Sequence, residues 1–191
     1  TLILACSDNG PDPELGSPGP FRGYKTQLFE GGIRSSLVAW APTLMNEDAL
    51  GTVNQDSIFS AIDLVPSLLE ICQASPAPNT TFDGEPLPDI LLGESNSSRK
   101  KPIFFRRPPD RNRFYGVNDL PDLAIRNGRW KLLCEYDGSA PLLYDLSIDP
   151  KESKNLAKQR PDILKELTKA VVAWHNAMPT DNGPALEYGS D

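Results

Sequence analysis

Residues 7–34 hold side chains whose types and spacing suit a metal ion bound beside an anion. Asp8 and Asn9 follow a short apolar run, and carboxylate and amide oxygens are both ligands of hard cations such as Ca²⁺. Lys25 lies in a glycine-rich stretch, where its ammonium can neutralise an anion without competing for the metal. The same Asp-Asn-Gly-Pro sequence is also typical of a surface turn. The spacing alone leaves both interpretations open, a metal-and-anion site and a plain loop.

Two apolar runs flank this segment. Residues 2–6 are apolar without alternation, which predicts a strand buried on both faces, as in a parallel sheet. Residues 33–40 predict a second strand, which Pro42 ends. A helix is expected to begin with Asp63 as its N-cap and to run to about Cys72. Strand, loop, strand and helix in this order indicate an α/β layer.

A proline-rich stretch separates this part from the rest of the chain. Residues 74–88 contain four prolines and read as a linker or a rigid surface connection. We place a boundary here, so that residues 1–75 are the end of an α/β domain and residues 76–191 form a C-terminal subdomain. The chain as a whole is then an α+β fragment of an α/β protein.

The second part predicts a small antiparallel sheet packed on a C-terminal helix. Asn127-Gly128, between two apolar runs, is the strongest hairpin signal in the chain. Residues 161–178 place apolar side chains at steps of three and four, which predicts a helix whose apolar stripe covers the sheet. The runs that predict strands are residues 103–105, 123–125, 130–134 and 142–144.

Composition excludes several classes of protein. The net charge of −7 argues against a nucleic-acid partner, because such proteins present a basic surface. No apolar run approaches the roughly 20 residues that cross a bilayer, so no membrane partner is expected. The chain opens inside a strand-like run without Met, and we interpret it as a piece of a longer protein. Cys6, Cys72 and Cys134 are far apart and odd in number, which excludes a fully paired disulfide framework, and their apolar neighbours predict that each is a buried small hydrophobe.

Two further features have a plain and a functional interpretation. His175, the single histidine, is expected to be a surface or packing residue rather than a catalyst. Residues 99–113 contain seven Lys or Arg with Phe104 and Phe105 between them. They suit either an anionic polymer such as a sulfated glycan, or a strand with a buried centre and solvated ends; we favour the strand.

Several motifs, in their order along the chain, resemble the carboxy-terminal part of the sulfatase family. The resemblance spans nearly the whole chain, and the joint order of the motifs makes it much more specific than any one of them. The motifs are Ser7-Asp8-Asn9-Gly10, residues 21–25 (FRGYK), residues 29–34 (FEGGIR), residues 62–69 (IDLVPSLL), Asp83-Gly84, residues 126–133 (RNGRWKLL) and residues 143–156 (LYDLSIDPKESKNL).

This resemblance implies an alkaline-phosphatase-like fold and the hydrolysis of sulfate esters, of aryl or carbohydrate type. Asp8 and Asn9 would be ligands of Ca²⁺, and Lys25 would contact the substrate sulfate. Apart from the resemblance, the acidic loop Asp12–Glu14 and the basic stretch from Arg99 are both candidates for the border of a substrate pocket. Family members are commonly exported, which suggests a periplasmic, lysosomal or secreted location.

The sequence departs from the family at the nucleophile. Sulfatases make a formylglycine from Cys or Ser in a Cys-x-Pro-x-Arg segment, and none of the three cysteines has that context. The family's first metal-binding pair and its active-site histidines are also missing, and two oxygen ligands are too few for Ca²⁺, which takes 6–8. We therefore expect a chain that is inactive alone and binds Ca²⁺ weakly or not at all. Its expected partners are the missing amino-terminal portion and, through an exposed sheet edge, further copies of itself.

Two other functions stay open from the sequence. One is a phosphatase or phosphodiesterase of the alkaline phosphatase superfamily; the Glu-Gly-Gly-Ile-Arg segment with Lys25 before it favours a sulfatase instead. The other is a stand-alone binding or structural module that has kept the fold and lost the chemistry. An intact Cys-x-Pro-x-Arg segment upstream would exclude the module.

Overall fold

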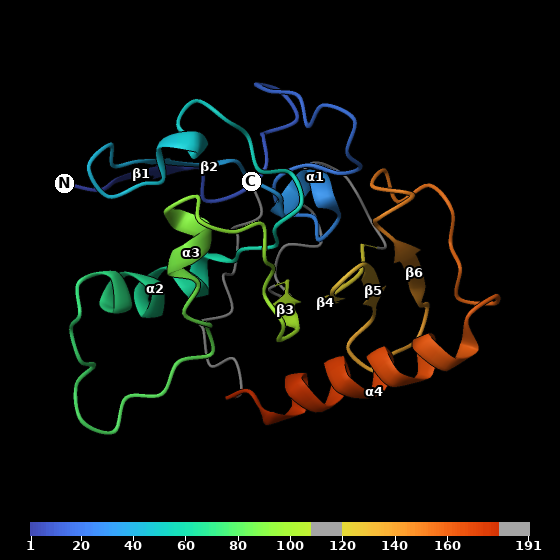
Figure 1. The fold of residues 1–191 in the computed structure, drawn as a ribbon. Coiled ribbons are helices and arrows are strands. Elements are labelled where there is room, and N and C mark those ends of the chain that lie inside the picture. The colour runs from blue at the N-terminus through green and yellow to red at the C-terminus, as the bar shows by residue number, and fades with distance from the viewer. Residues whose placement is uncertain (108–119, 180–191) are drawn as a thin grey trace, which may run out of the picture. The chain divides into compact units, whose positions relative to one another are not determined.

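The structure, a computed structural model, describes residues 1–107 and 120–179 (Figure 1). No helix in these ranges is long and apolar enough to cross a bilayer. The described helices and strands are β1 (Ile3–Cys6), α1 (Glu30–Ile33), β2 (Leu37–Trp40), the short 3₁₀ helices η1 (Glu47–Ala49) and η2 (Ala61–Asp63), α2 (Leu64–Ile71), α3 (Pro88–Leu91), β3 (Ile103–Arg106), β4 (Leu123–Asn127), β5 (Trp130–Cys134), β6 (Leu142–Asp145) and α4 (Pro161–Ala177).

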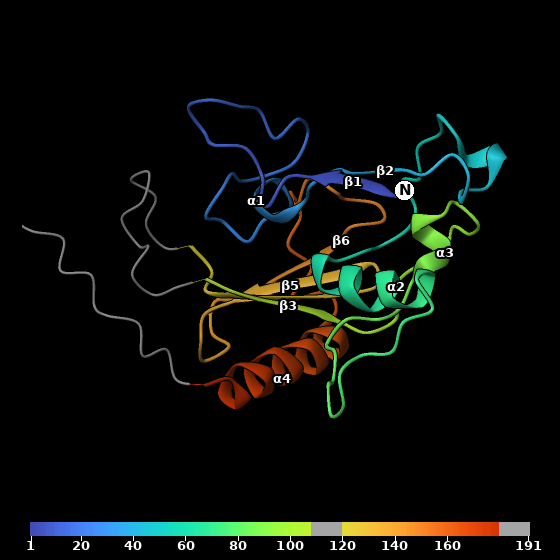
Figure 2. The ribbon, with the colours of Figure 1, turned by 90° about the vertical axis from the view of Figure 1, so that its left-hand side faces the viewer.

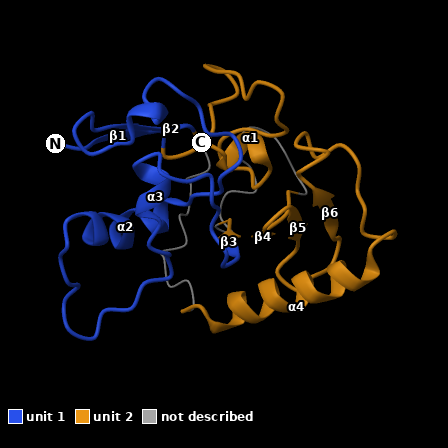
Figure 3. Ribbon diagram, viewed as in Figure 1, with its two compact units in different colours: residues 1–7, 36–103 blue, residues 8–35, 104–191 orange. Residues whose placement is uncertain are grey.

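The chain divides into two compact units, each built from two stretches (Figure 3). Unit 1 comprises residues 1–7 and 36–103, and unit 2 comprises residues 8–35 and 104–191. The segment between the first two strands therefore belongs to unit 2, although both strands belong to unit 1. The division at residues 75 and 76 stays a prediction.

Unit 1 contains a two-stranded sheet in which β1 pairs antiparallel with β2, Ile3 opposite Trp40. The expectation of a parallel strand buried on both faces is wrong for this pair, since Ile3 is 52% exposed and Val38 61% exposed. Four apolar residues in a row cannot by themselves distinguish the two kinds of sheet.

The predicted helix after the second strand is confirmed within a residue at each end. η2 runs directly into α2, Pro66 lies in the first turn of α2, and α2 packs against α3. Asp63 stands at the N-cap position, but its side chain makes no capping bond to α2. That part of the expectation is wrong because the buried carboxylate is engaged by other donors, described below.

Unit 2 contains the predicted antiparallel sheet, with strand order β3-β4-β5-β6. α4 lies along one face of this sheet, as Figure 2 shows, and its side chains Leu167 and Val171 are buried against β4, β5 and β6. Alternate residues of the strands point to the opposite face, where Leu28 and Phe29 pack on Ala124. The helix and its covering role are thus confirmed, and the sheet is buried on both faces.

The hairpin between β4 and β5 is confirmed, with its loop one residue later than the dipeptide that predicted it. Asn127 pairs with Trp130, so the two loop residues are Gly128 and Arg129. Gly128 has φ +56°, a conformation that a two-residue hairpin needs at its first loop position and that glycine adopts without steric cost.

The three cysteines differ in their surroundings. Cys134 is buried, and burial raises the pKa of its thiol to about 12. Cys6 and Cys72 are exposed, so the expectation of burial is wrong for both. Cys6 ends the thinly covered β1, and Cys72 follows the last residue of α2, where apolar sequence neighbours do not enclose it. All three are free thiols, in line with the exclusion of a fully paired disulfide framework.

His175 is a packing residue, as expected. Its ring stacks on that of Tyr136 with a centroid separation of 4.8 Å, near the end of α4. Nothing in this contact resembles the pairing of a general base with a nucleophile.

Candidate functional site

The three candidate site residues lie on one folded segment of unit 2, residues 8–35. Asp8 is exposed and Asn9 half-buried, and the Asn9 Nδ2 donates a hydrogen bond of 2.8 Å to the carbonyl of Gly10. Lys25 is half-buried, and its backbone N–H donates to the carbonyl of Pro11 at 2.9 Å. The backbone at Lys25 is therefore tied to the turn that follows Asp8 and Asn9.

Glycines hold the two ends of this segment together. The Gly10 N–H donates to the Gly32 carbonyl at 2.8 Å, and the Gly31 N–H donates to the Arg22 carbonyl at 2.6 Å. A Cβ on Gly10 would lie 1.8 Å from the oxygen of Gly31, so no side chain fits there. The Gly-Gly pair in α1 thus permits a close approach of backbone to backbone.

A buried group of charges anchors this segment to the sheet of unit 2. The Lys131 Nζ lies 3.0 Å from Glu30 Oε1 and 2.9 Å from Glu152 Oε1. All three side chains are at most 1% exposed. Arg126 adds a further contact, with its guanidinium 3.4 Å from Glu30 Oε2. Buried charges are tolerated only when paired in this way, so each member depends on the others.

Burial affects the ionisation of two members of this group. Burial raises the pKa of Glu152 above its ordinary value, and although Lys131 acts in the opposite direction, the nearby charge of Glu30 adds to the rise. Burial likewise lowers the pKa of Arg126, against the favourable charge of Glu30. Both pKa shifts thus follow the cost of removing a charge from water, although each group lies near an opposite charge.

Glu152 makes two more contacts with the site segment. Its Oε2 accepts a hydrogen bond of 2.7 Å from the backbone N–H of Glu30, and its carbonyl accepts one of 3.3 Å from Arg22. The same Arg22 nitrogen donates to the Tyr144 hydroxyl at 3.0 Å. The Arg22 guanidinium also lies over the ring of Phe29, 3.9 Å from its centroid.

Sequence reasoning assigned no role to Glu30, Lys131 or Glu152, although all three lie in motifs that it noted. One signal was available for Lys131, which interrupts the apolar run of β5 between Trp130 and Leu132. A lysine there must find a buried anion. Its partners could not be identified, because they lie far away along the chain.

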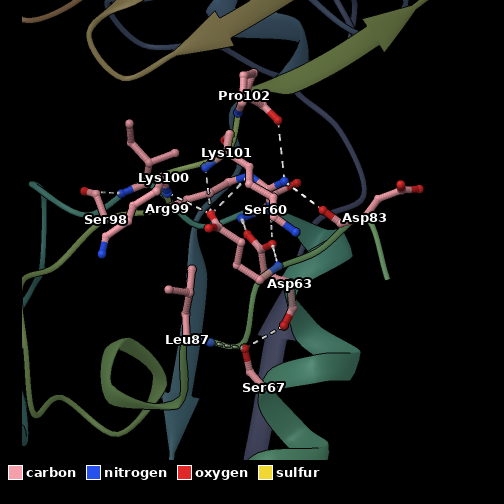
Figure 4. Close-up of polar contacts among 12 residues, drawn as sticks. Ser60, Asp63, Ser67, Asp83, Leu87, Ser98, Arg99, Lys100, Lys101 and Pro102 are labelled. Atoms are coloured by element: carbon pink, nitrogen blue, oxygen red, sulfur yellow. Dashed lines mark hydrogen bonds and ion pairs between the residues drawn. The ribbon is translucent and has the colours of Figure 1, made fainter. Parts of the chain in front are cut away.

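A second buried network lies in unit 1 (Figure 4). Asp63 Oδ1 accepts from the Arg99 guanidinium and, at 2.7 Å, from the backbone N–H of Glu85. Asp63 Oδ2 accepts from the Ser60 N–H at 2.8 Å. Arg99 also donates to the Asp83 carbonyl at 3.0 Å. Each oxygen of the carboxylate is thus satisfied by a donor from the loops around α2.

Ser67 and Gly84 extend this network. The Ser67 hydroxyl donates to the Asp63 carbonyl at 2.6 Å and accepts from the Leu87 N–H at 2.8 Å (Figure 4). A Cβ on Gly84 would lie 1.9 Å from the Ile62 carbonyl oxygen. The network therefore joins α2 to the proline-rich stretch by hydrogen bonds and an ion pair, and its role is structural.

The side chain of Glu85 lies at the solvent side of this network and accepts hydrogen bonds from the backbone N–H groups of Lys100 and Lys101. Burial opposes its ionisation, but the backbone N–H groups of Lys101 and Lys100 and the charge of Arg99 outweigh burial. The pKa of Glu85 consequently lies below its ordinary value.

The described part of the basic stretch favours the strand over a binding surface. The Arg99 side chain is 2% exposed, and Arg107, at 5%, pairs with Asp122 at 2.9 Å. Ile103 is buried, and the half-buried Phe104 stacks on Trp174 with a centroid separation of 5.1 Å, so the expected strand is confirmed. The expectation of solvated ends is wrong for Arg99 and Arg107, whose buried guanidinium groups form ion pairs. The later part of the stretch, from residue 108, lies outside the described residues.

The described residues hold no complete set of calcium ligands. Among residues 1–107 and 120–179, no three His, Cys, Asp or Glu side chains gather as metal ligands. Asp8 and Asn9 provide oxygen donors of the right chemical kind, but two ligands do not satisfy an ion that takes 6–8. Neither of two open grooves, one along α4 and one along α2, is lined by Asp8, Asn9 or Lys25.

Comparison with known proteins gives a consistent result. No protein-family model matches the chain. Human arylsulfatase A is 33% identical over 196 residues, which cover 87% of this chain and 36% of that protein. The N-acetylgalactosamine-6-O-sulfatase of Bacteroides thetaiotaomicron is 28% identical over 196 residues, which cover 88% of this chain and 35% of that protein.

Solved structures agree with these relatives. One from work on the metabolism of multiple glycosaminoglycans by Bacteroides thetaiotaomicron matches with a TM-score of 0.72 at 25% identity. The match covers 92% of this chain and 39% of that one. In each of these comparisons this chain spans less than two-fifths of the other protein's length.

Proposed function

Because this chain is a sulfatase-family sequence along most of its length, with part of the alkaline-phosphatase-like fold, we propose that it contributes to the hydrolysis of sulfate esters. The observation that carries the proposal is the match to arylsulfatase A over 87% of the chain, a span that includes most of its motifs. Relatives that are all sulfatases favour this function over the phosphatase and the stand-alone module. The substrate class is an aryl or carbohydrate sulfate, with a sulfated glycan preferred.

We assign three residues of segment 8–35 to this chemistry. Asp8 and Asn9 supply two of the oxygen ligands of Ca²⁺, and Lys25 contacts the sulfate of the substrate. When bound, the ion polarises a sulfate oxygen as a Lewis acid. The Lys25 ammonium stabilises the negative charge that remains on the sulfate as its ester bond breaks.

The nucleophile and the remaining metal ligands belong, in this proposal, to an amino-terminal portion outside the chain. No cysteine here is followed by the proline and arginine that formylglycine formation requires. The chain alone is then inactive.

The function is tested in two forms of the protein. The 191-residue chain is expected to show no aryl-sulfate turnover and, by calorimetry, no calcium binding tighter than about 1 mM, since two ligands leave the ion largely hydrated. Joined to its upstream catalytic portion, the protein is expected to turn over aryl sulfates. There, Lys25→Met should lower kcat/KM by about 10²–10³-fold, as loss of one transition-state contact does.

Matched variants make this test specific. Lys154→Met, at an exposed lysine of the same unit, should leave kcat/KM unchanged. Micromolar calcium binding by the 191-residue chain, lost in Asp8→Ala and accompanied by turnover, would show that the site is complete here. Full activity of Lys25→Met in the extended protein would remove Lys25 from the site.

The partner is expected to dock on the sheet of unit 1. Ile3, Val38 and Trp40 expose large apolar side chains on β1 and β2, more than a strand pair usually leaves in water. We propose that the amino-terminal portion covers this surface, and that copies of the isolated chain associate through it.

Sedimentation velocity tests this surface. The isolated chain is expected to form dimers or larger species as its concentration rises, and Val38→Ser/Trp40→Ser to shift the chain toward monomer. Leu15→Ser is the control, because Leu15 is 89% exposed but belongs to unit 2 and not to the strand pair. A wild-type chain that stays monomeric at high concentration would contradict the prediction.

A further inference from the structure

We propose that Glu152 is a positioning residue that fixes the segment carrying Lys25, Asp8 and Asn9. This role rests on the proposed function, which is what makes residues 8–35 part of a site. The experiment that tests it measures only the structure of the chain and does not need that function. Glu152 lies in the loop after β6, more than a hundred residues from the segment that it holds.

The first support is the number of contacts that one residue makes. One carboxylate oxygen of Glu152 accepts from the Glu30 N–H at 2.7 Å, and the other lies 2.9 Å from Lys131 Nζ. Its carbonyl accepts from Arg22 at 3.3 Å. Both the backbone and the side chain of Glu152 thus reach the segment.

The second support is the backbone of Glu152 itself. Its φ is +54°, in the left-handed region that glycine adopts easily and a glutamate does not. A residue held in a disfavoured conformation requires contacts that over-determine it. Glycine would relieve this strain and lose the carboxylate, so a glutamate here indicates that the side-chain contacts matter more.

The third support is the route from Glu152 to the site residues. The Arg22 guanidinium donates to the Glu152 carbonyl. The Arg22 backbone carbonyl in turn accepts a hydrogen bond of 2.6 Å from the Gly31 N–H. Gly32 accepts from Gly10, the residue after Asn9, at 2.8 Å. Arg22 also stands three residues before Lys25. Two contacts of Glu152, at Glu30 and Arg22, therefore restrain the backbone on both sides of Lys25 and reach the Asp8-Asn9 turn.

The opposing hypothesis is that Glu152 only stabilises unit 2 as a whole. The two ideas differ in where amide protection is lost. A general stabiliser affects β4, β5 and α4 as much as residues 8–35. A positioning residue affects residues 8–35 and leaves the amides of β5 and α4 protected.

Hydrogen exchange followed by mass spectrometry on the 191-residue chain distinguishes them. In Glu152→Ala, Lys131 keeps Glu30 as its partner, so peptides from residues 8–35 are expected to exchange about tenfold faster or more, well beyond any change in peptides from β5 and α4. Glu152→Gln retains an acceptor for the Glu30 N–H and should restore most of the protection. Ala140→Gly is the matched control, since Ala140 has φ +48° in the same unit and lies in the loop between β5 and β6, outside the buried group of charges.

Each outcome decides the proposal. Unchanged exchange in residues 8–35 of Glu152→Ala would overturn it, as would a uniform rise across unit 2 or a variant that does not fold. Equal exchange in the Gln and Ala variants would remove the role of the acceptor. No sulfate, calcium or turnover enters this measurement. Local loosening in Glu152→Ala beside full activity of Lys25→Met would keep the positioning role and reject the sulfate role.

Discussion

Replacing Lys131 with methionine is expected to lower the free energy of unfolding by about 3–5 kcal/mol, the cost of removing one partner from a buried ion pair. The side chain is 0% exposed, and its ammonium lies within 3.0 Å of two carboxylates. Methionine fills a similar volume but leaves Glu30 and Glu152 facing each other without a cation between them. Urea denaturation, followed by circular dichroism, measures the change.

Two further variants show whether the loss comes from charge. Lys169→Met replaces an exposed lysine on α4 and should stay within about 0.5 kcal/mol of the wild type. The triple variant Glu30→Gln/Lys131→Met/Glu152→Gln removes all three charges and should recover more than half of the loss, because neutral groups bear burial better than unpaired ions. A Lys131→Met chain as stable as the wild type would show that water solvates the two carboxylates, or that Arg126 compensates their charge.

The second large effect is expected from Asp63→Ala in unit 1, at about 3–4 kcal/mol. The change removes the acceptor for Arg99 and for the N–H groups of Ser60 and Glu85. Arg99, with 2% of its side chain exposed, would lose its closest anion and keep only backbone carbonyl partners, at Asp83, Lys101 and Pro102, and the more distant carboxylate of Glu85. Thermal and urea unfolding report the loss.

Its controls separate charge from hydrogen bonding. Asp63→Asn keeps one acceptor oxygen and should cost less than the alanine variant. Asp48→Ala, at an exposed aspartate of the same unit, should change the free energy of unfolding by less than about 0.5 kcal/mol. If Asp48→Ala and Asp63→Ala cost the same, the network of Figure 4 contributes no stability of its own.

Local patterns predicted the elements that are long or have specific turn chemistry. α4 was evident because its apolar residues recur at helical spacing over 17 residues. The β4–β5 hairpin was evident because a glycine-containing turn separates two apolar runs. β1 was assigned to the wrong kind of sheet, because four apolar residues carry no information about their partner strand.

The chemistry of the candidate site was visible only in part. Asp8, Asn9 and Lys25 could be proposed from residue type and family resemblance, and their roles remain predictions. The groups that hold their segment in place could not be derived, since the contacts of Glu30 with Lys131 and Glu152 join residues 101 and 122 positions apart. No local periodicity reports a contact of that range.

The same separation has a consequence for synthesis of the protein on the ribosome. Glu30 leaves the ribosome 122 residues before Glu152, its most distant anchor. Because translation adds about 5–20 residues per second, roughly 6–24 s pass between the synthesis of Glu30 and that of Glu152. During this time the Glu30 carboxylate is in water and segment 8–35 lacks its contacts with Glu152. This segment becomes ordered late in translation, and until then chaperones and proteases can reach it.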